Sequence, residues 1–189
     1  MNMKTLATIA PFAAASALGL LAAAPAAAQL AQSSDAPVDI TADAVEVVTS
    51  QCVSIWSGSA EALQDRTRLR ADVLKTISAK GPARPGGQAS CGAVSRIEAT
   101  GNVYYVTPQQ RVRGDAAVYN VEADTIVITG DVVAAQGENV MRGRRLTINV
   151  STGDAQMQSN VTGRGAQGRP RAVIYPNRQP ADQQAAARR

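Results

Sequence analysis

A small residue followed by aspartate recurs at a fixed spacing, and this repeat constrains the fold more than any other feature of the sequence. The aspartates are Asp43, Asp72 and Asp115, and a degenerate copy has Arg144 at the equivalent place. The steps from 43 to 72 and from 115 to 144 are both 29 residues, whereas the step between them is 43 residues, 14 longer. A fixed period of this length is typical of proteins that stack one structural unit repeatedly.

A second phrase keeps phase with the first and carries a strand signature. It places a small residue two positions before an apolar one, at 58–60, 101–103, 130–132 and 159–161. Around it, apolar and polar residues alternate, as in Ile126, Ile128, Gly130 and Val132. Alternation with a period of two predicts half-buried β-strands rather than helices.

The alternation slips by one residue at each aspartate phrase. Val112 and Gly114 share a face before Asp115, but Ala117 and Tyr119 share it afterwards. We interpret this as a bulge or corner at which one extra residue re-aims the strand. Each repeat is then two strand arms meeting at an angle, and the stack has two apolar walls joined along a bent seam. The residues alone do not decide between antiparallel strands and a parallel solenoid.

The first 28 residues have the anatomy of a secretory signal peptide. Lys4 supplies a positive start, an apolar run follows over 6–21, and 26–28 is a small-residue cleavage site. The alternative is an uncleaved membrane anchor, which Pro11 and Pro25 disfavour. We therefore expect export to an oxidising compartment by a cleaved signal peptide.

The rest of the chain divides by composition. We expect a linker over 29–37, a β domain over 38–162 with an insertion loop at about 78–93, and a basic, disordered tail over 163–189. Within the tail, Val173-Ile174-Tyr175 is a candidate terminal strand. The tail holds six arginines against one aspartate, so the isoelectric point of about 9.4 reflects the tail and not the domain. No basic face is interleaved with aromatic residues, which argues against nucleic acid as a partner.

The chain has two cysteines, and we predict that they form a disulfide. Cys52 and Cys91 both lie in the connection leading into the glycine phrase, in neighbouring repeats. If neighbouring repeats stack, these connections share a corner, and an oxidising compartment makes pairing the default. The alternative is a pair of inert thiols in a loop rich in Gly and Pro.

The residue types needed for common enzyme chemistry are missing. The sequence contains no histidine, the commonest general base and metal ligand, and bridged cysteines make no zinc site. The repeated aspartates occur one per repeat, without the paired carboxylates of a polysaccharide-cleaving enzyme. We expect no enzyme activity, no metal and no cofactor.

Three arginines near the end of the repeat lack a local acidic residue. Arg142, Arg144 and Arg145 replace the alternating charges seen at the earlier corners. Such a cluster is a candidate contact for phosphate, and the alternative is a solvated rim.

The repeated phrases resemble the organic-solvent-tolerance (OstA-like) domain family. The resemblance rests on 40–43, 69–72, 100–103, 112–119 and 129–132, and extends over about 38–162. It implies a bent β-jellyroll of stacked antiparallel strands, open at both ends. It also implies a periplasmic lipid carrier that bridges inner- and outer-membrane transport complexes and binds the lipid A acyl chains of lipopolysaccharide.

The implied partners are lipopolysaccharide and transport proteins with similar jellyrolls, with head-to-tail self-association as a further possibility. The rival readings are a periplasmic β-repeat scaffold that binds protein edges without lipid, a membrane-anchored partner subunit, and a detached amino-terminal domain of the outer-membrane receptor. The inward parity of the two walls supplies the candidate lipid-binding residues. They are Val45, Val47, Leu69, Leu74, Ile97, Val103, Tyr105, Val112, Tyr119, Ile126, Ile128, Val132, Met141, Leu146, Ile148 and Met157.

Overall fold

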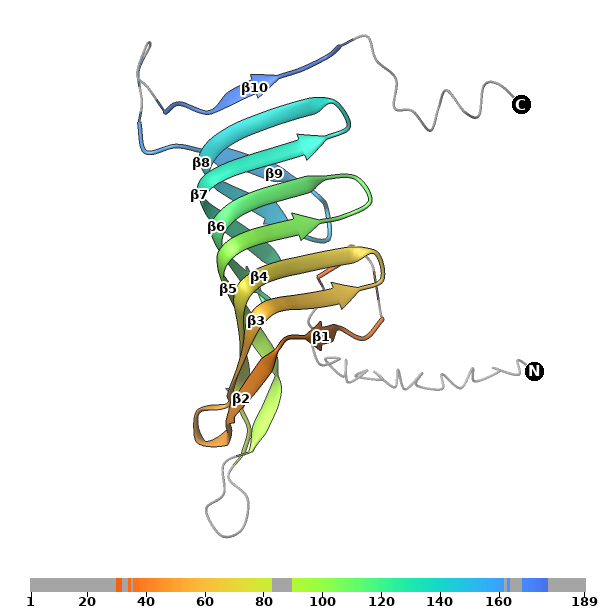
Figure 1. The fold of residues 1–189 in the computed structure, drawn as a ribbon, viewed down its shortest axis with the longest axis vertical. Coiled ribbons are helices and arrows are strands. Elements are labelled where there is room, and N and C mark those ends of the chain that lie inside the picture. The colour runs from red at the N-terminus through yellow and green to blue at the C-terminus, as the bar shows by residue number, and fades with distance from the viewer. Residues whose placement is uncertain are drawn as a thin grey trace, which may run out of the picture.

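The chain folds as one ten-stranded sheet in which all neighbouring strands are antiparallel (Figure 1). A computed structural model describes residues 30–31, 34, 36–82, 90–161, 163 and 168–176. The antiparallel arrangement confirms the bent, stacked fold and settles the choice that the residues alone left open. The predicted signal peptide lies outside the described residues.

The elements follow one another along the stack. They are β1 (Asp39–Thr41), β2 (Ala44–Val48), the 3₁₀ turn η1 (Thr49–Gln51), β3 (Val53–Gln64), β4 (Thr67–Lys80), β5 (Cys91–Val106), β6 (Arg111–Asn120), β7 (Thr125–Gln136), β8 (Asn139–Asn149), β9 (Ala155–Gln158) and β10 (Arg171–Val173). No helix within the described part of the chain is long and apolar enough to cross a membrane.

The two ends of the sheet each carry two short strands on one long one. At the first end, β1 and β2 both pair with β3, and at the other end β9 and β10 both pair with β8. β1 lies along residues 61–63 of β3, whereas β2 lies along 53–57. Each long strand therefore has two arms that run in different directions, and each short strand extends one arm only.

The bend between the arms coincides with register shifts in the ladders. Between β7 and β8, Thr129 pairs with Arg145 and Val132 with Gly143, so β7 holds one more residue than its partner there. The extra residue is accommodated by Gly130, whose φ is 105°. The parity slip at the aspartate phrase is present as predicted, but the extra residue lies in the glycine phrase of the neighbouring strand. Our placement of it at the aspartate was wrong, because a left-handed backbone favours glycine.

The two repeated phrases meet at this bend. Each aspartate carboxylate lies against the glycine of the next copy of the second phrase, within the distance at which a Cβ would collide. The contact recurs at the same place in three successive repeats, which explains why the phrases keep one register. The pairs are Asp43 with Gly58, Asp72 with Gly101, and Asp115 with Gly130.

The disulfide prediction is confirmed. Cys52 and Cys91 are bonded, with their Cα atoms 5.4 Å apart. The bridge joins the residue after η1 to the first residue of β5. The strands β4 and β5 extend to Lys80 and from Cys91, and so run into the segment expected as an insertion loop.

Candidate functional site

The inner faces of the two arms enclose an apolar trough. We call the arm that ends in β2 and β9 the first wall, and the arm that ends in β1 and β10 the second wall. Cross-strand pairs place apolar side chains in continuous rows along each wall, because the same alternation is repeated in every strand.

One row runs along the whole first wall and one along the whole second wall. In the first wall it comprises Val45, Trp56, Leu74, Ala99, Ala117, Ile128, Leu146 and Met157, in that order. In the second wall it comprises Ile40, Ala62, Leu69, Tyr105, Val112, Ala134, Met141 and Ala172.

Every candidate lining residue lies on an inward row of one wall. Twelve of them are buried, and Met157 is half-buried against the same cluster. Val45 and Val47 are 51% and 63% exposed, because β2 is the last strand of its arm. Met141 is 38% exposed near the other end of the stack. The middle of the trough is therefore filled by the side chains of its own walls, and its ends are open.

A cavity of about 980 Å³ occupies the trough near β8 and β9. Leu146, Ile148 and Ala155 line it from the first wall, and Met141 and Ala172 line it from the second. This volume is in the range of pockets that hold small organic ligands. The lining offers dispersion contacts and burial of apolar surface, which suit a hydrocarbon chain and involve no covalent chemistry.

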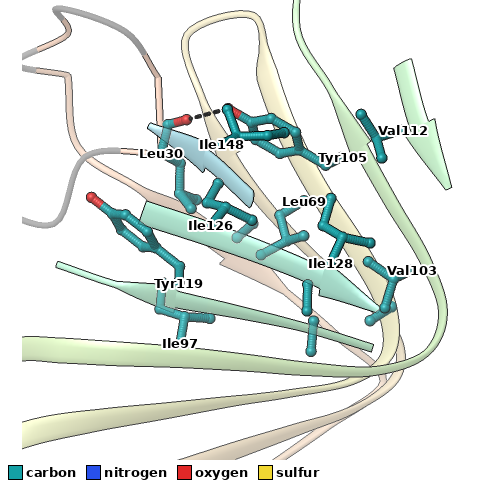
Figure 2. Close-up of a cluster of buried hydrophobic side chains, with 14 of the residues drawn as sticks. Leu30, Leu69, Ile97, Val103, Tyr105, Val112, Tyr119, Ile126, Ile128 and Ile148 are labelled. Carbon is teal, nitrogen blue, oxygen red and sulfur yellow. Dashed lines mark hydrogen bonds between the residues drawn. The ribbon is translucent and has the colours of Figure 1, made fainter. Parts of the chain in front are cut away.

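Sequence reasoning missed several residues of the trough, among them Trp56 in the first-wall row and, outside any strand, Leu30. Leu30 lies in the segment expected as a linker, yet it is fully buried in the core between the walls (Figure 2). Its carbonyl oxygen accepts a hydrogen bond from the Tyr105 hydroxyl at 3.2 Å. A single leucine beside polar residues has no periodicity, so no strand signal could have identified it.

Tyr105 is a buried titratable group inside the trough. Burial, with smaller contributions from Tyr119 and Asp124, raises the pKa of Tyr105 to about 12. The phenol therefore stays neutral at physiological pH and serves as a hydrogen-bond donor inside the trough.

The arginine cluster lies on the outer side of the sheet. Arg142 and Arg145 alternate with the inward Met141, Gly143 and Leu146 and so point away from the trough. Arg144 and Arg145 line a second hollow of about 430 Å³, and none of the three arginines forms an ion pair with a described residue. Phosphate contact by Arg142, Arg144 and Arg145 stays a prediction.

No metal centre is found in the part of the chain that the structure describes. No group of three or more His, Cys, Asp or Glu side chains there could hold an ion. The trough is thus the candidate site, and its chemistry is apolar.

Comparison with known proteins agrees with this geometry. Residues 39–154 match the family described as LptA/(LptD N-terminal domain) LPS transport protein. An uncharacterised protein of Rhizobium meliloti is 30% identical over 130 residues, which cover 67% of this chain and 68% of that protein.

A solved structure has the same fold. LptH of Pseudomonas aeruginosa, described as the LptA-homologous periplasmic component of the conserved lipopolysaccharide transport device, superimposes with a TM-score of 0.60. The match covers 75% of this chain and 96% of LptH at 17% identity, so it speaks for the fold. Since the family match spans most of the sheet, the chain belongs to the LptA/LptD amino-terminal domain family of lipopolysaccharide transport proteins, the OstA-like group that its repeated phrases resemble.

Proposed function

We propose that this protein is a non-enzymatic periplasmic carrier that binds the acyl chains of lipopolysaccharide in the trough. In this role it bridges inner-membrane and outer-membrane transport complexes. The observation that carries the proposal is the continuity of the apolar rows across the stack, ending in an open cavity. The proposal also places the processed chain in the periplasm, after cleavage of the predicted signal peptide.

The free energy gained by burying acyl chains in the trough favours a lipid with several chains. Burial of one methylene contributes about 0.8 kcal/mol, so roughly ten methylenes match the free energy of a micromolar complex. Association itself costs about 4–15 kcal/mol, which leaves a single short chain weakly bound. Several chains together exceed that cost, and small aliphatic side chains form no deep contact that would stop them sliding.

Lipid entry requires the walls to separate in the middle of the stack. Ile128 in the first wall and Val132 beyond the bend are fully buried, and neither lines the cavity near β8 and β9. Strands β3 to β8 pass from one wall to the other at the seam, and each wall keeps its own ladder of hydrogen bonds. We therefore propose that the arms open about the seam as acyl chains advance from the cavity.

Bridging would use the two ends of the sheet. β1 and β2 present strand edges at one end, and β9 presents one at the other, where β10 covers the remaining part of the β8 edge. An unpaired edge accepts a strand from another chain, and head-to-tail addition does not close on itself. The edges would thus join related jellyrolls, or copies of this chain, into one continuous trough.

A photo-crosslinking amino acid tests lipid binding at matched positions on β9. Ala155 and Gln156 are both exposed, but Ala155 lines the cavity and Gln156 faces the opposite way. We expect lipopolysaccharide adducts at Ala155 and none at Gln156. Protein adducts without lipid at either position would favour the scaffold reading instead.

A further inference from the structure

We infer that the start of the described chain is a built-in occupant of the trough, which an acyl chain displaces on binding. We call its described residues Leu30, Ala31, Ser34 and Ala36 the N-terminal plug. The inference rests on the proposed function and adds a competitor within the chain itself.

The side chain of Leu30 fills the space that a hydrocarbon chain would fill. It is 0% exposed and belongs to the same buried cluster as both walls. Figure 2 shows Leu30 next to Tyr105 of the second wall, to which it is hydrogen-bonded. A branched four-carbon side chain in this place is chemically similar to a short segment of an acyl chain.

A buried glutamine holds the plug. Gln64, the last residue of β3, is only 2% exposed. Its Oε1 accepts the backbone N–H groups of Leu30 at 2.6 Å and Ala31 at 3.0 Å, and its Nε2 donates to the carbonyl of Ala36 at 2.7 Å. A buried side-chain amide that lacks hydrogen-bond partners destabilises a protein. The plug supplies the partners that the Gln64 amide needs in this apolar trough.

The plug can leave without disturbing the sheet. Neither Leu30 nor Ala31 belongs to a strand, and their hydrogen bonds go to the side chains of Gln64 and Tyr105. Gln64 adjoins the exposed turn between β3 and β4, where water can replace the lost bonds. Detachment therefore breaks side-chain contacts and leaves every ladder intact.

The plug lies next to the free volume of the trough. Ala31 lines the cavity together with Tyr105, Leu146 and Ile148. An acyl chain that extends from the cavity past Ala31 enters the buried cluster that contains Leu30. Binding to the full length of the trough then competes with the plug. The apparent affinity is the intrinsic affinity multiplied by the fraction of free molecules whose plug is already displaced.

Two leucine substitutions separate a displaceable plug from an ordinary core residue. Leu30→Ala weakens the plug, whereas Leu69→Ala removes an equally buried leucine from β4, a strand that cannot be displaced. The probes are fluorescently labelled dodecanoic acid and purified lipopolysaccharide. We expect Leu30→Ala to bind dodecanoic acid about tenfold more tightly than the unaltered chain, equivalent to about 1.4 kcal/mol. Leu69→Ala, which removes part of the proposed lining itself, should bind dodecanoic acid less tightly than the unaltered chain.

Hydrogen exchange gives a second readout on the unaltered chain. We expect lipopolysaccharide to accelerate exchange of the Leu30 and Ala31 amides, because displacement frees them from Gln64. Unchanged affinity for both probes in Leu30→Ala, or bound lipopolysaccharide without faster exchange at these amides, overturns the plug and leaves the carrier function standing. A gain for dodecanoic acid with no binding of lipopolysaccharide by any variant supports the plug and overturns the carrier function.

Discussion

The carboxylate of Asp115 lies directly against Gly130 at the bend between β6 and β7. A Cβ on Gly130 would collide with Asp115 Oδ2, and the φ of Gly130 is 105°. The same oxygen accepts a hydrogen bond from the backbone N–H of Asp131 at 3.2 Å. Glycine is thus required at position 130 because a Cβ has no room there and because the backbone φ is positive. The Asp115 carboxylate holds the strand in the bent conformation that this glycine permits.

We predict that Gly130→Ala destabilises the protein strongly. A left-handed backbone at a non-glycine residue costs roughly 1–3 kcal/mol, and displacement of the Asp115 carboxylate adds to it. The total loss in the free energy of unfolding, measured in urea, should exceed about 2 kcal/mol. Gly137→Ala is the matched control, because its φ is also positive, at 57°, but nothing lies within 4 Å of the added Cβ.

Combining Gly130→Ala with Asp115→Ala separates the collision from the backbone strain. Removal of the carboxylate should restore part of the lost stability, so the two substitutions should not be additive. Equal losses in Gly130→Ala and Gly137→Ala would show that the carboxylate does not enforce the glycine.

We predict that loss of the Cys52–Cys91 bridge lowers stability by up to about 4 kcal/mol. The two cysteines are 39 residues apart in sequence, and closure of a loop of this length restricts the unfolded chain by about that amount. Thermal unfolding of a double Cys→Ser variant should begin at lower temperature than that of the oxidised chain. A reducing agent should lower the unfolding temperature of the unaltered chain and leave the double variant unchanged. Insensitivity of the unaltered chain would contradict the prediction.

We predict that stability falls in strong alkali because of Tyr105. Its pKa is about 12 in the folded chain and about 10 when unfolded, so the unfolded state loses the phenolic proton first. The contribution is complete below pH 10 and is lost as pH rises to about 12, amounting to about 3 kcal/mol at most. Urea unfolding between pH 9 and 12 measures it.

Tyr105→Phe is the matched control for this pH dependence. It keeps the ring and removes the hydroxyl that donates to Leu30. The free energy of unfolding should therefore be lower at pH 9 and should fall less steeply as the pH rises. An unchanged slope in Tyr105→Phe would assign the alkaline loss to another group.

The repeat made the trough predictable from sequence. Alternation depends on two neighbouring positions in one strand, so the residues it selected fall on shared rows of the ladders, and lipid contact by them stays a prediction. How far each is buried depends on which strand ends the stack, which explains the exposure of Val45 and Val47. Alternation also could not show whether the extra residue lies in the strand with the aspartate phrase or in the strand with the glycine phrase. Either position produces the same change of direction between the two arms.

Leu30 and β10 mark the limit of that reasoning. Leu30 is buried through hydrogen bonds to Gln64 and Tyr105, which are distant in sequence and follow no period. The strand β10 occupies Arg171–Val173 and begins two residues before the segment we expected to add a terminal strand. Three residues next to proline and arginine carry little strand propensity, so their pairing depends on the edge of β8.

We predict that β10 limits head-to-tail association by occupying that edge. Its residues pair with β8 through Arg171 with Arg142, Ala172 with Met141 and Val173 with Val140. Ala172→Pro should weaken this pairing and free the edge of β8 for a second chain, because proline has no backbone N–H to donate to the ladder. Light scattering across a concentration series should then detect larger assemblies than the unaltered chain forms. Ile174→Pro, which lies just outside the strand, is the control, and equal assembly in both variants would contradict a capping role for β10.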